Sequence, residues 1–316
     1  MDWDRVIYNG TVVNDDGMQR ADIYIRDGRI AAVTSERLPG TVGEATDASG
    51  RYILPGLIET HVHSRDGRLA TGEKEDFRSS TAAAAATGIT TVFEMPNCTP
   101  TIHSAESLRD LVSVIQPKAH ADFCVWGLAL GDANLASLPA LAEAGCVAFK
   151  FFWGYAVDRR DNSLIYNYRE GMDNVLPPPD DGQIYRLFRA VKATGKRLGI
   201  HAENFSIVRA LTQEALAAGA QDYAALLRTR PVSCETSIID TAIDMAKELT
   251  ELEALKAAGS TDPGAVKAAL PGVTYTGVSG ELRYLGVESS ITRPPKPITS
   301  PRMSMIGNMT RFRKRS

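Results

Sequence analysis

The sequence predicts an α/β protein whose parallel strands fit a (β/α)₈ barrel better than an open sheet. Apolar, β-branched runs alternate with helical runs from about residue 55 to about residue 247, which is typical of parallel α/β folds. Histidine and lysine residues lie in or at the ends of these runs, and a barrel opens all its strand ends on one face. No glycine-rich phosphate loop follows any strand, which counts against a nucleotide fold.

Size and composition exclude several classes of protein. The 316 residues are 44% hydrophobic, with a net charge of −3. No apolar run reaches the roughly 20 residues of a membrane span, and the start lacks the pattern of a signal peptide. We therefore expect a cytoplasmic protein with neither membrane nor nucleic acid as a partner. The four cysteines are scattered, which predicts reduced core thiols rather than disulfides or a zinc knuckle: Cys98, Cys124, Cys146 and Cys234.

Residues 1–54 predict a small N-terminal β domain. Apolar stretches flank Asn-Gly and Asp-Gly pairs, which favour hairpin turns. The predicted strands are Val6 to Val13, Ala21 to Ile25 and Ile30 to Val33, and the turn pairs are Asn9-Gly10, Asp16-Gly17 and Asp27-Gly28.

Residues 55–247 predict about five strand-helix units, which makes the barrel incomplete. Connections between such units are right-handed almost without exception. The predicted strands are Ile53 to Ile58, Ile89 to Met95, Ala121 to Leu130, Cys146 to Phe152 and Arg197 to His201, and the predicted helices are Ser79 to Ala86, Leu135 to Ala144 and Gln183 to Thr194. Residues 158–181, rich in Pro, Asn and Asp, predict an irregular stretch.

Two histidines follow the first of these strands. The run from Ile53 to Ile58 reads as a buried strand, and side chains two residues apart point to the same side. His61 and His63 could therefore bind one metal ion together, because neutral imidazole is the commonest protein ligand. The alternative is a pair of hydrogen-bonded histidines at a strand end.

Lys150 and His201 stand in or at the end of two later strands. A protonated lysine cannot bind a metal, but the neutral amine reacts with CO₂ to a carbamate whose oxygens can bridge two cations. The alternatives are a lysine that reaches a carboxylate and a histidine of the core. In a barrel these two side chains could converge with the histidine pair.

Four motifs, in this order, resemble the cyclic amidohydrolases, the family of dihydroorotases, hydantoinases (dihydropyrimidinases) and allantoinases. They are PGLIETHVHSR, KEDFRSSTAAAAATGITTVFEMPNCTPT, AFKFFWGY and GIHAEN, which begin at Pro55, Lys74, Ala148 and Gly199. The resemblance runs from about residue 4 to about residue 245, with Glu59 where the family usually has Asp.

The resemblance implies a TIM-barrel-type, metal-dependent hydrolase that opens a small cyclic amide. His61 and His63 would hold one divalent metal, His201 would hold a second, and carbamylated Lys150 would bridge both. Zinc suits imidazole ligands, while manganese or cobalt would be tolerated. A pair of metals activates water and polarises the amide carbonyl.

The same resemblance assigns substrate contacts that disagree on specificity. Arg65 matches the dihydroorotase residue that binds the substrate carboxylate, and Asn97 matches another contact of that branch. Tyr155 instead matches a hydantoinase-type residue that hydrogen-bonds the ring carbonyl. Which cyclic amide is the substrate therefore stays open.

The chain also departs from the family. The family takes another histidine ligand from the sixth strand, and from the eighth an aspartate that is both ligand and proton shuttle. No histidine follows His201, and no residue matches that aspartate, so no catalytic residue is identified. The alternative is an inactive homologue, or a chimeric fragment, that serves as a binding or assembly partner. An open sheet edge would favour pairing with another chain, a homo-oligomer included.

Residues 248–290 form a divergent C-terminal segment, and residues 291–316 a basic tail of disordered composition. We expect helices over Thr241 to Ala258 and Gly264 to Leu270. The stretch from Leu252 to Tyr284 resembles the C-terminal part of periplasmic branched-chain amino-acid binding proteins. A chimera or a frame-shifted gene would explain both resemblances.

Overall fold

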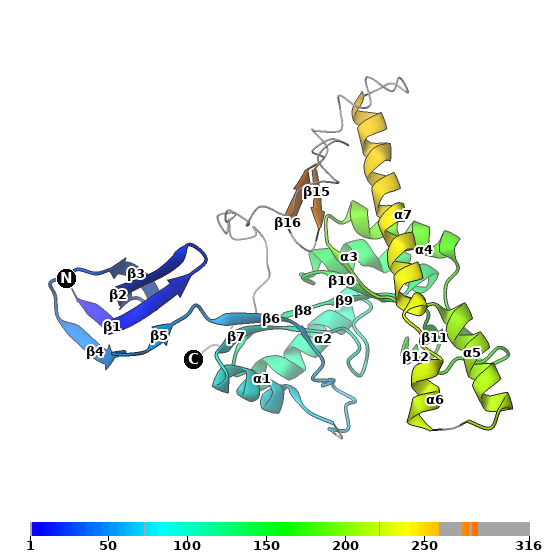
Figure 1. Cartoon of the computed structure of the whole chain (residues 1–316), viewed down its shortest axis with the longest axis horizontal. Coiled ribbons are helices and arrows are strands. Elements are labelled where there is room, and N and C mark those ends of the chain that lie inside the picture. Colours follow the sequence, from blue (N-terminus) through cyan, green and yellow to red (C-terminus); the bar gives the residue numbers. More distant parts are fainter. Residues whose placement is uncertain (1, 73, 221, 259–273, 278–279, 284–316) are drawn as a thin grey trace. The chain divides into compact units, whose positions relative to one another are not determined.

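The computed structural model describes residues 2–72, 74–220, 222–258, 274–277 and 280–283 (Figure 1). The chain divides between Leu57 and Ile58 into two compact units. The break lies close to the predicted end of the small β domain at residue 54.

The first unit is a five-stranded sheet in the order β3-β2-β1-β4, with β5 also paired to β1. Its strands are β1 Trp3–Asn14, β2 Gly17–Arg26, β3 Arg29–Thr34, β4 Val42–Asp47 and β5 Tyr52–Ile53. The pairs β1/β2 and β2/β3 are antiparallel, whereas β4 and β5 run parallel to β1. The three predicted strands are confirmed, and β4 was missed.

One predicted hairpin turn of this unit is wrong. Asn9-Gly10 lies inside β1, where the register with β2 shifts between Ile7 and Gly10. Asn9 has a φ of 63°, and its amide donates to Asp22 Oδ1 at 3.0 Å. Asn tolerates the left-handed region, and the register shift shows that the pair forms a β-bulge instead of a turn. Position 10 requires glycine, because a Cβ there would lie 2.3 Å from Ile53 Cδ1.

The second unit is built on parallel strands in chain order. They form two three-stranded sheets, β6-β7-β8 and β9-β10-β14, and the pairs β7/β8, β9/β10 and β10/β14 are parallel. The strands are β6 Leu57–Val62, β7 Ile89–Glu94, β8 Asp122–Val125, β9 Gly127–Ala129, β10 Phe149–Phe152 and β14 Leu198–His201.

Only Trp126 separates β8 from β9. Val147 N donates to Val125 O at 2.9 Å and Gly127 N donates to Ala148 O at 2.8 Å, so the pairing with the next strand continues across the break. The two sheets therefore amount to five consecutive parallel strand positions within the described residues, which correspond to the five predicted strands.

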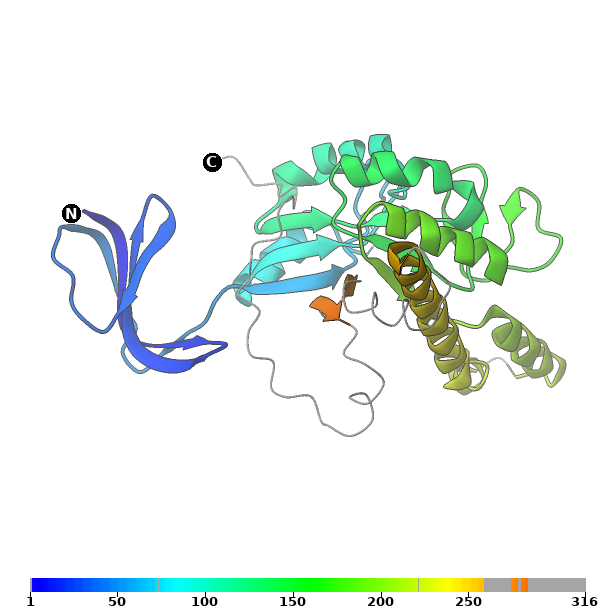
Figure 2. The ribbon, with the colours of Figure 1, turned by 90° about the horizontal axis from the view of Figure 1, so that it is seen from above.

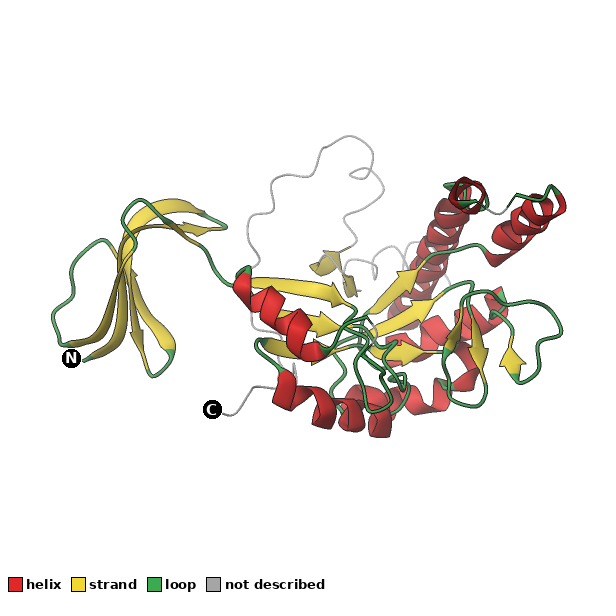
Figure 3. Cartoon of the chain, turned by 90° about the horizontal axis from the view of Figure 1, so that it is seen from below, coloured by secondary structure: helices red, strands yellow, loops and turns green. Residues whose placement is uncertain are grey.

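Helices follow these strands and cover one side of them (Figures 2 and 3). They are α1 Phe77–Ala86, α2 Ala105–Ile115, α3 Leu138–Glu143, α4 Asp181–Ala193, α5 Phe205–Ala217, α6 Tyr223–Arg228 and α7 Ser233–Ala258, with short 3₁₀ turns at Gln116–Lys118, Gly131–Ala133 and Leu135–Ser137. Asp76, Ser104 and Asp180 close capping boxes at the starts of α1, α2 and α4.

The core of this unit lies between the strands and helices α1 to α4. Its fully buried members include aromatic and aliphatic side chains from both layers: Phe77, Leu108, Phe123, Phe149 and Ile184. All four cysteines are buried and free, which confirms their prediction as core thiols.

The predicted first strand needs the largest correction. Ile53 to Ile58 is not one buried strand, because Pro55 and Gly56 interrupt it and leave β5 and β6 separate. Leu57 and Ile58 are 54% and 48% exposed. Within the described residues β6 pairs only with β7, so the apolar composition of the run did not indicate burial.

Other boundaries differ in detail. The sequence analysis did not predict α2, although Ser104 and the spacing of Leu108, Leu111 and Ile115 are typical of a capped amphipathic helix. Residues 158–181 are not wholly irregular, because β12 Leu164–Ile165 and β13 Val175–Leu176 pair with β11 Ala156–Asp158. The predicted helix at Thr241 to Ala258 is longer and begins at Ser233.

At the C-terminal end, β15 Thr274–Gly277 and β16 Gly280–Arg283 form an antiparallel pair. The predicted helix from Gly264 to Leu270, the basic tail and much of the stretch from Leu252 to Tyr284 lie outside the described residues. None of the described helices combines the length and apolar character needed to cross a membrane.

Candidate functional site

The four predicted metal ligands lie at or near the carboxyl ends of the strands. His61 is in β6, His63 directly follows it, Lys150 is in β10 and His201 ends β14. In the register of β10 and β14, Lys150 is opposite Gly199 and Phe152 is opposite His201. Because side chains alternate along a strand, Lys150 and His201 point to the same face of this strand pair.

His61 and His63 form a close pair. Their Nε2 atoms are 3.0 Å apart, and the Nδ1 of His63 is 2.7 Å from Asn97 Oδ1. A carbonyl oxygen only accepts, so Nδ1 of His63 carries the proton. The Nε2 lone pair of a neutral His63 therefore faces His61.

Burial and nearby positive charge favour the neutral form of both rings. Burial lowers the pKa of His61, and the charges of Lys150 and His201 lower it further, against the raising effect of Glu59. Burial also lowers the pKa of His63, against the raising effect of the Asn97 hydrogen bond, and the charges of His61, Arg65 and Lys150 lower it further. Lys150 and His201 thus act electrostatically on the histidine pair, and neutral imidazole is the metal-binding form.

Lys150 is buried in the strand, with 6% of its surface exposed. Desolvation lowers its pKa, which favours the neutral amine. Its Nζ lies 5.3 Å from the centroid of the Phe152 ring. Within the described part of the chain no carboxylate forms an ion pair with it, so the alternative reading of a lysine that reaches a carboxylate finds no partner there.

His201 belongs to a different cluster. Its Nε2 is 3.1 Å from the Tyr155 hydroxyl and 3.2 Å from Glu203 Oε2. Tyr155 donates to the same Oε2 at 2.7 Å, and Arg230 Nε donates to Glu203 Oε1 at 3.0 Å. The hydrogen bonds from His201 and Tyr155, with Arg230, lower the pKa of Glu203 to about 2, whereas burial and Glu203 raise that of Tyr155.

Glu203 and Arg230 are not among the site residues predicted from the sequence. Glu203 stands two residues after His201 in the GIHAEN motif, and this spacing puts side chains on one side of an extended chain. Arg230 follows α6 and carried no comparable signal.

The other two predicted substrate contacts occupy neighbouring loops. The guanidinium of Arg65 has no hydrogen-bond or ion-pair partner among the described residues, and its φ is 55°. Asn97 Nδ2 is 3.5 Å from the Tyr166 hydroxyl, and the Tyr166 ring stacks edge-on against Tyr155 at 5.1 Å. Asn97 thus touches His63 and reaches towards the cluster around Tyr155, which links the two halves of the site.

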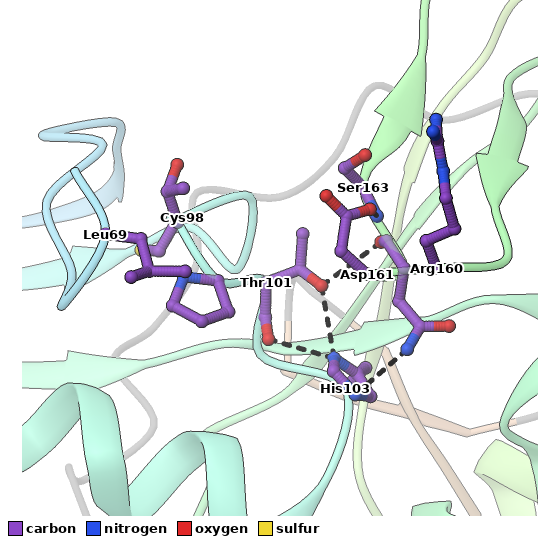
Figure 4. Close-up of a pocket in the computed structure, with 10 residues that line it drawn as sticks. Leu69, Cys98, Thr101, His103, Arg160, Asp161 and Ser163 are labelled. Atoms are coloured by element: carbon purple, nitrogen blue, oxygen red, sulfur yellow. Dashed lines mark hydrogen bonds between the residues drawn. The ribbon is translucent and has the colours of Figure 1, made fainter. Parts of the chain in front are cut away.

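A cavity of about 360 Å³ lies beside these loops (Figure 4). Its walls come from the loops after β7 and β11, which His103 connects, and from Leu69 in the loop after β6. His103 Nδ1 contacts Thr101 O at 3.0 Å, and its Nε2 is 3.1 Å from Asn162 Nδ2. Both ring nitrogens of His103 therefore have hydrogen-bond partners, and the side chain connects the loop after β7 to the loop after β11.

The geometry of the histidine pair fits a metal ion. Tetrahedral zinc–nitrogen bonds of about 2.0–2.1 Å put two ligands of one ion roughly 3.3–3.4 Å apart, and the Nε2 separation here, 3.0 Å, is a few tenths of an ångström shorter. No group of three or more His, Cys, Asp or Glu side chains suited to a metal occurs among the described residues. A third ligand would therefore have to be of another kind, and Lys150 is the candidate.

Comparison with known proteins places these residues in context. Residues 52–249 match the model of the amidohydrolase family. An L-hydantoinase of Paenarthrobacter aurescens is 29% identical over 246 residues, which cover 78% of this chain and 50% of that protein. An allantoinase of Desulfitobacterium hafniense is 34% identical over 251 residues, which cover 78% of this chain and 51% of that protein.

Solved structures agree with these matches. An L-hydantoinase (dihydropyrimidinase) from Arthrobacter aurescens aligns with a TM-score of 0.68 and 26% identity, covering 84% of this chain and 57% of that chain. A D-hydantoinase aligns with a TM-score of 0.64 and 26% identity, covering 83% and 55%. The chain thus spans about half the length of the curated relatives it matches.

Proposed function

Since this chain belongs to the amidohydrolase family and has a TIM-barrel-type fold, we propose that it is a metal-dependent hydrolase of carbon–nitrogen bonds in small cyclic amides. The observation that carries the proposal is the histidine pair: Nε2 atoms 3.0 Å apart, with the tautomer of His63 set by Asn97. A pair of hydrogen-bonded structural histidines would not need Lys150 beside it in an apolar strand.

His61, His63, His201 and carbamylated Lys150 would hold two divalent metals, of which zinc suits the imidazoles best. When bound, such metals polarise the amide carbonyl and lower the pKa of water. The burial of Lys150, at 6% exposure, supports the neutral amine that reaction with CO₂ requires. Its carbamate would supply anionic oxygens to a site otherwise made of neutral imidazoles.

The substrate contacts act around this centre. Tyr155 keeps its proton, because burial and Glu203 raise its pKa, and its hydroxyl can donate to a ring carbonyl after a small rotation away from Glu203. Ring opening produces a carboxylate, and the unpartnered guanidinium of Arg65 would bind it. Asn97 orients His63 through its carbonyl oxygen, which leaves only its amide group for a substrate.

These contacts favour a cyclic ureide of the hydantoin or allantoin type as the substrate. Tyr155 is the hydantoinase-type residue of the chain, and relatives named hydantoinase and allantoinase match over 78% of it. Asn97, one of the two dihydroorotase-type residues, has its carbonyl oxygen occupied by His63.

The described strands supply only five positions of the barrel, and none of the described residues takes the part of the eighth-strand aspartate. We therefore propose an incomplete barrel, preceded by a small β domain, whose activity in this chain is impaired. The exposed edge of β6 favours pairing with another chain, a second copy included. The competing function is that of an inactive homologue that acts as a binding partner, and the same count of five barrel strands among the described residues favours it.

A turnover and metal assay tests the proposal. Zinc-loaded, monodisperse protein is assayed on dihydroorotate, dihydrouracil, hydantoin and allantoin, with metal content measured in parallel. We expect bound zinc, and rates at least about a hundredfold below those of a complete homologue, because the acid-base group is missing. His61→Ala should lose zinc, whereas His120→Ala should not, since the exposed His120 precedes β8 at the opposite strand end. Equal zinc content in wild type and His61→Ala would refute the metal site.

A further inference from the structure

Glu94 is a buried carboxylate to which the proposed chemistry assigns no role. It is the last residue of β7 and only 1% exposed. Charged side chains are almost never buried this deeply unless they are paired or hydrogen-bonded. The partners of the Glu94 carboxylate are two backbone amides and the thiol of Cys98, whose Sγ lies 3.6 Å from Oε1.

These amides belong to the two residues directly after His63. Ser64 N donates to Glu94 Oε1 at 3.0 Å and lies 3.3 Å from Oε2. Arg65 N donates to Oε1 at 3.3 Å. The chain leaves the sheet here, and with Arg65 in the left-handed region the two amides make no strand ladder. Ser64 is buried and Arg65 partly buried, so without Glu94 their amides would lack an acceptor where water reaches them poorly, which is costly.

The segment that begins with Glu94 holds the histidine loop at three successive points. Met95 N donates to Val62 O at 2.8 Å, Glu94 binds Ser64 and Arg65, and Asn97 Oδ1 binds His63 Nδ1 at 2.7 Å. Asn97 thus holds the ring of His63 by a hydrogen bond to Nδ1, and Glu94 holds the backbone of the next two residues.

We propose that Glu94 is a positioning residue for the His61–His63 metal pair and for Arg65, acting through the backbone of Ser64 and Arg65. The proposal rests on the metal-binding function proposed above. Loss of the acceptor would let the loop rotate and would separate the Nε2 atom of His63 from that of His61. Partners behind a metal ligand typically change metal affinity by about 10–100-fold.

The test compares two side chains of nearly equal length. Glu94→Gln keeps a carbonyl acceptor for the amides, whereas Glu94→Met keeps the volume without any acceptor. Calorimetric titration with Zn²⁺ should give an affinity close to wild type for Glu94→Gln, and about 10–100-fold weaker for Glu94→Met. Asp158→Asn is the matched control: Asp158, at the end of β11, is also a buried carboxylate, 7% exposed, but its partner is the Arg160 side chain.

A metal-free readout separates this proposal from the metal site itself. The Nδ1–H of His63, followed by ¹H–¹⁵N NMR, should move in Glu94→Met and stay in place in Glu94→Gln and Asp158→Asn. If wild type binds no zinc but this pattern holds, the metal function fails and the positioning role of Glu94 stands. An unmoved Nδ1–H signal in Glu94→Met overturns the positioning role.

Should Glu94→Met fail to fold, Glu94→Asp takes its place, because the shorter side chain cannot reach both amides. It should then bind zinc more weakly than Glu94→Gln. Equal affinity in these two variants, or a tenfold loss in folded Glu94→Gln, would overturn the proposal.

Discussion

The two halves of the candidate site are prepared for a metal to different degrees. At the end of β6, the Nε2 atoms of His61 and His63 face each other at 3.0 Å. At the end of β14, the Nε2 of His201 already contacts Tyr155 and Glu203. In the first half the two Nε2 atoms contact, among the described residues, only each other and share one hydrogen bond, whereas in the second half the imidazole contacts both Tyr155 and Glu203, so an ion there must displace two hydrogen bonds.

The difference has a chemical origin in the residues behind each imidazole. Asn97 binds His63 at Nδ1, on the side away from the metal position, which orients the ring and leaves Nε2 available. Glu203 instead meets His201 at Nε2. We therefore expect the His61–His63 half to bind zinc more tightly than the His201 half.

In the proposed site carbamylated Lys150 would join the halves, so its removal should have the largest effect. Lys150→Ala should lower the metal content from about two ions per chain towards one or none, because a bridging anion is lost. Added bicarbonate should not restore it. Metal analysis after dialysis measures this, with His120→Ala as control; unchanged content in Lys150→Ala would return Lys150 to a structural role.

The pH dependence of stability should report the half that contains Glu94. Burial raises the pKa of Glu94 from 4.5 to about 7, so the folded protein binds its proton more tightly than the unfolded chain does. The corresponding stability is present below the unfolded value and is lost as pH rises through about 7. The Cys98 thiol beside it stays protonated, because burial raises its pKa.

Urea unfolding of metal-free protein measures this effect. Between about pH 5 and pH 8, wild type should lose about 2–3 kcal/mol relative to Glu94→Gln, which has no proton to exchange. A stability difference between the two proteins that does not change with pH would contradict the raised pKa of Glu94.

The smallest effect should be confined to the half that contains His201. Tyr155→Phe removes the hydroxyl that donates to Glu203 at 2.7 Å, which should cost about 1 kcal/mol of unfolding free energy. Zinc affinity at the His61–His63 pair should not change. Thermal unfolding and zinc titration measure the two quantities; a weakened pair would mean that the halves are coupled through Tyr166 and Asn97.

The order of the strands was predictable from the sequence, because buried parallel strands are visible as apolar runs. The exposure of the strands was not predictable. Leu57 and Ile58 are apolar like the residues of a core strand, but among the described residues β6 has a neighbouring strand on one side only. The Asn9-Gly10 pair shows a similar limit, since one conformational preference serves a turn and a bulge equally well.

The sequence indicated which residues belong to the candidate site better than it indicated the contacts between them. His61, His63, Lys150 and His201 could be named from their places in strands, and their roles as ligands stay predictions. The roles of Asn97 towards His63 and of Glu203 towards His201 depend on distances between separate loops, which spacing along the chain does not give. Glu94 was visible in the sequence as a single acidic residue in the apolar run before Met95. A charged residue in a strand can pair with a cation, face solvent or bind backbone amides, and the sequence does not distinguish these.

The break between β8 and β9 also provides an optical reporter. The indole of Trp126 donates from Nε1 to Thr60 O in β6 at 3.1 Å, and its ring lies against Gly199 of β14, where an added Cβ would lie 3.0 Å away. One chromophore therefore touches the first and the last of the five strands. The emission of Trp126, isolated by subtracting that of Trp126→Phe, should shift to longer wavelength when either edge strand detaches, and so it follows opening of the sheet without a label.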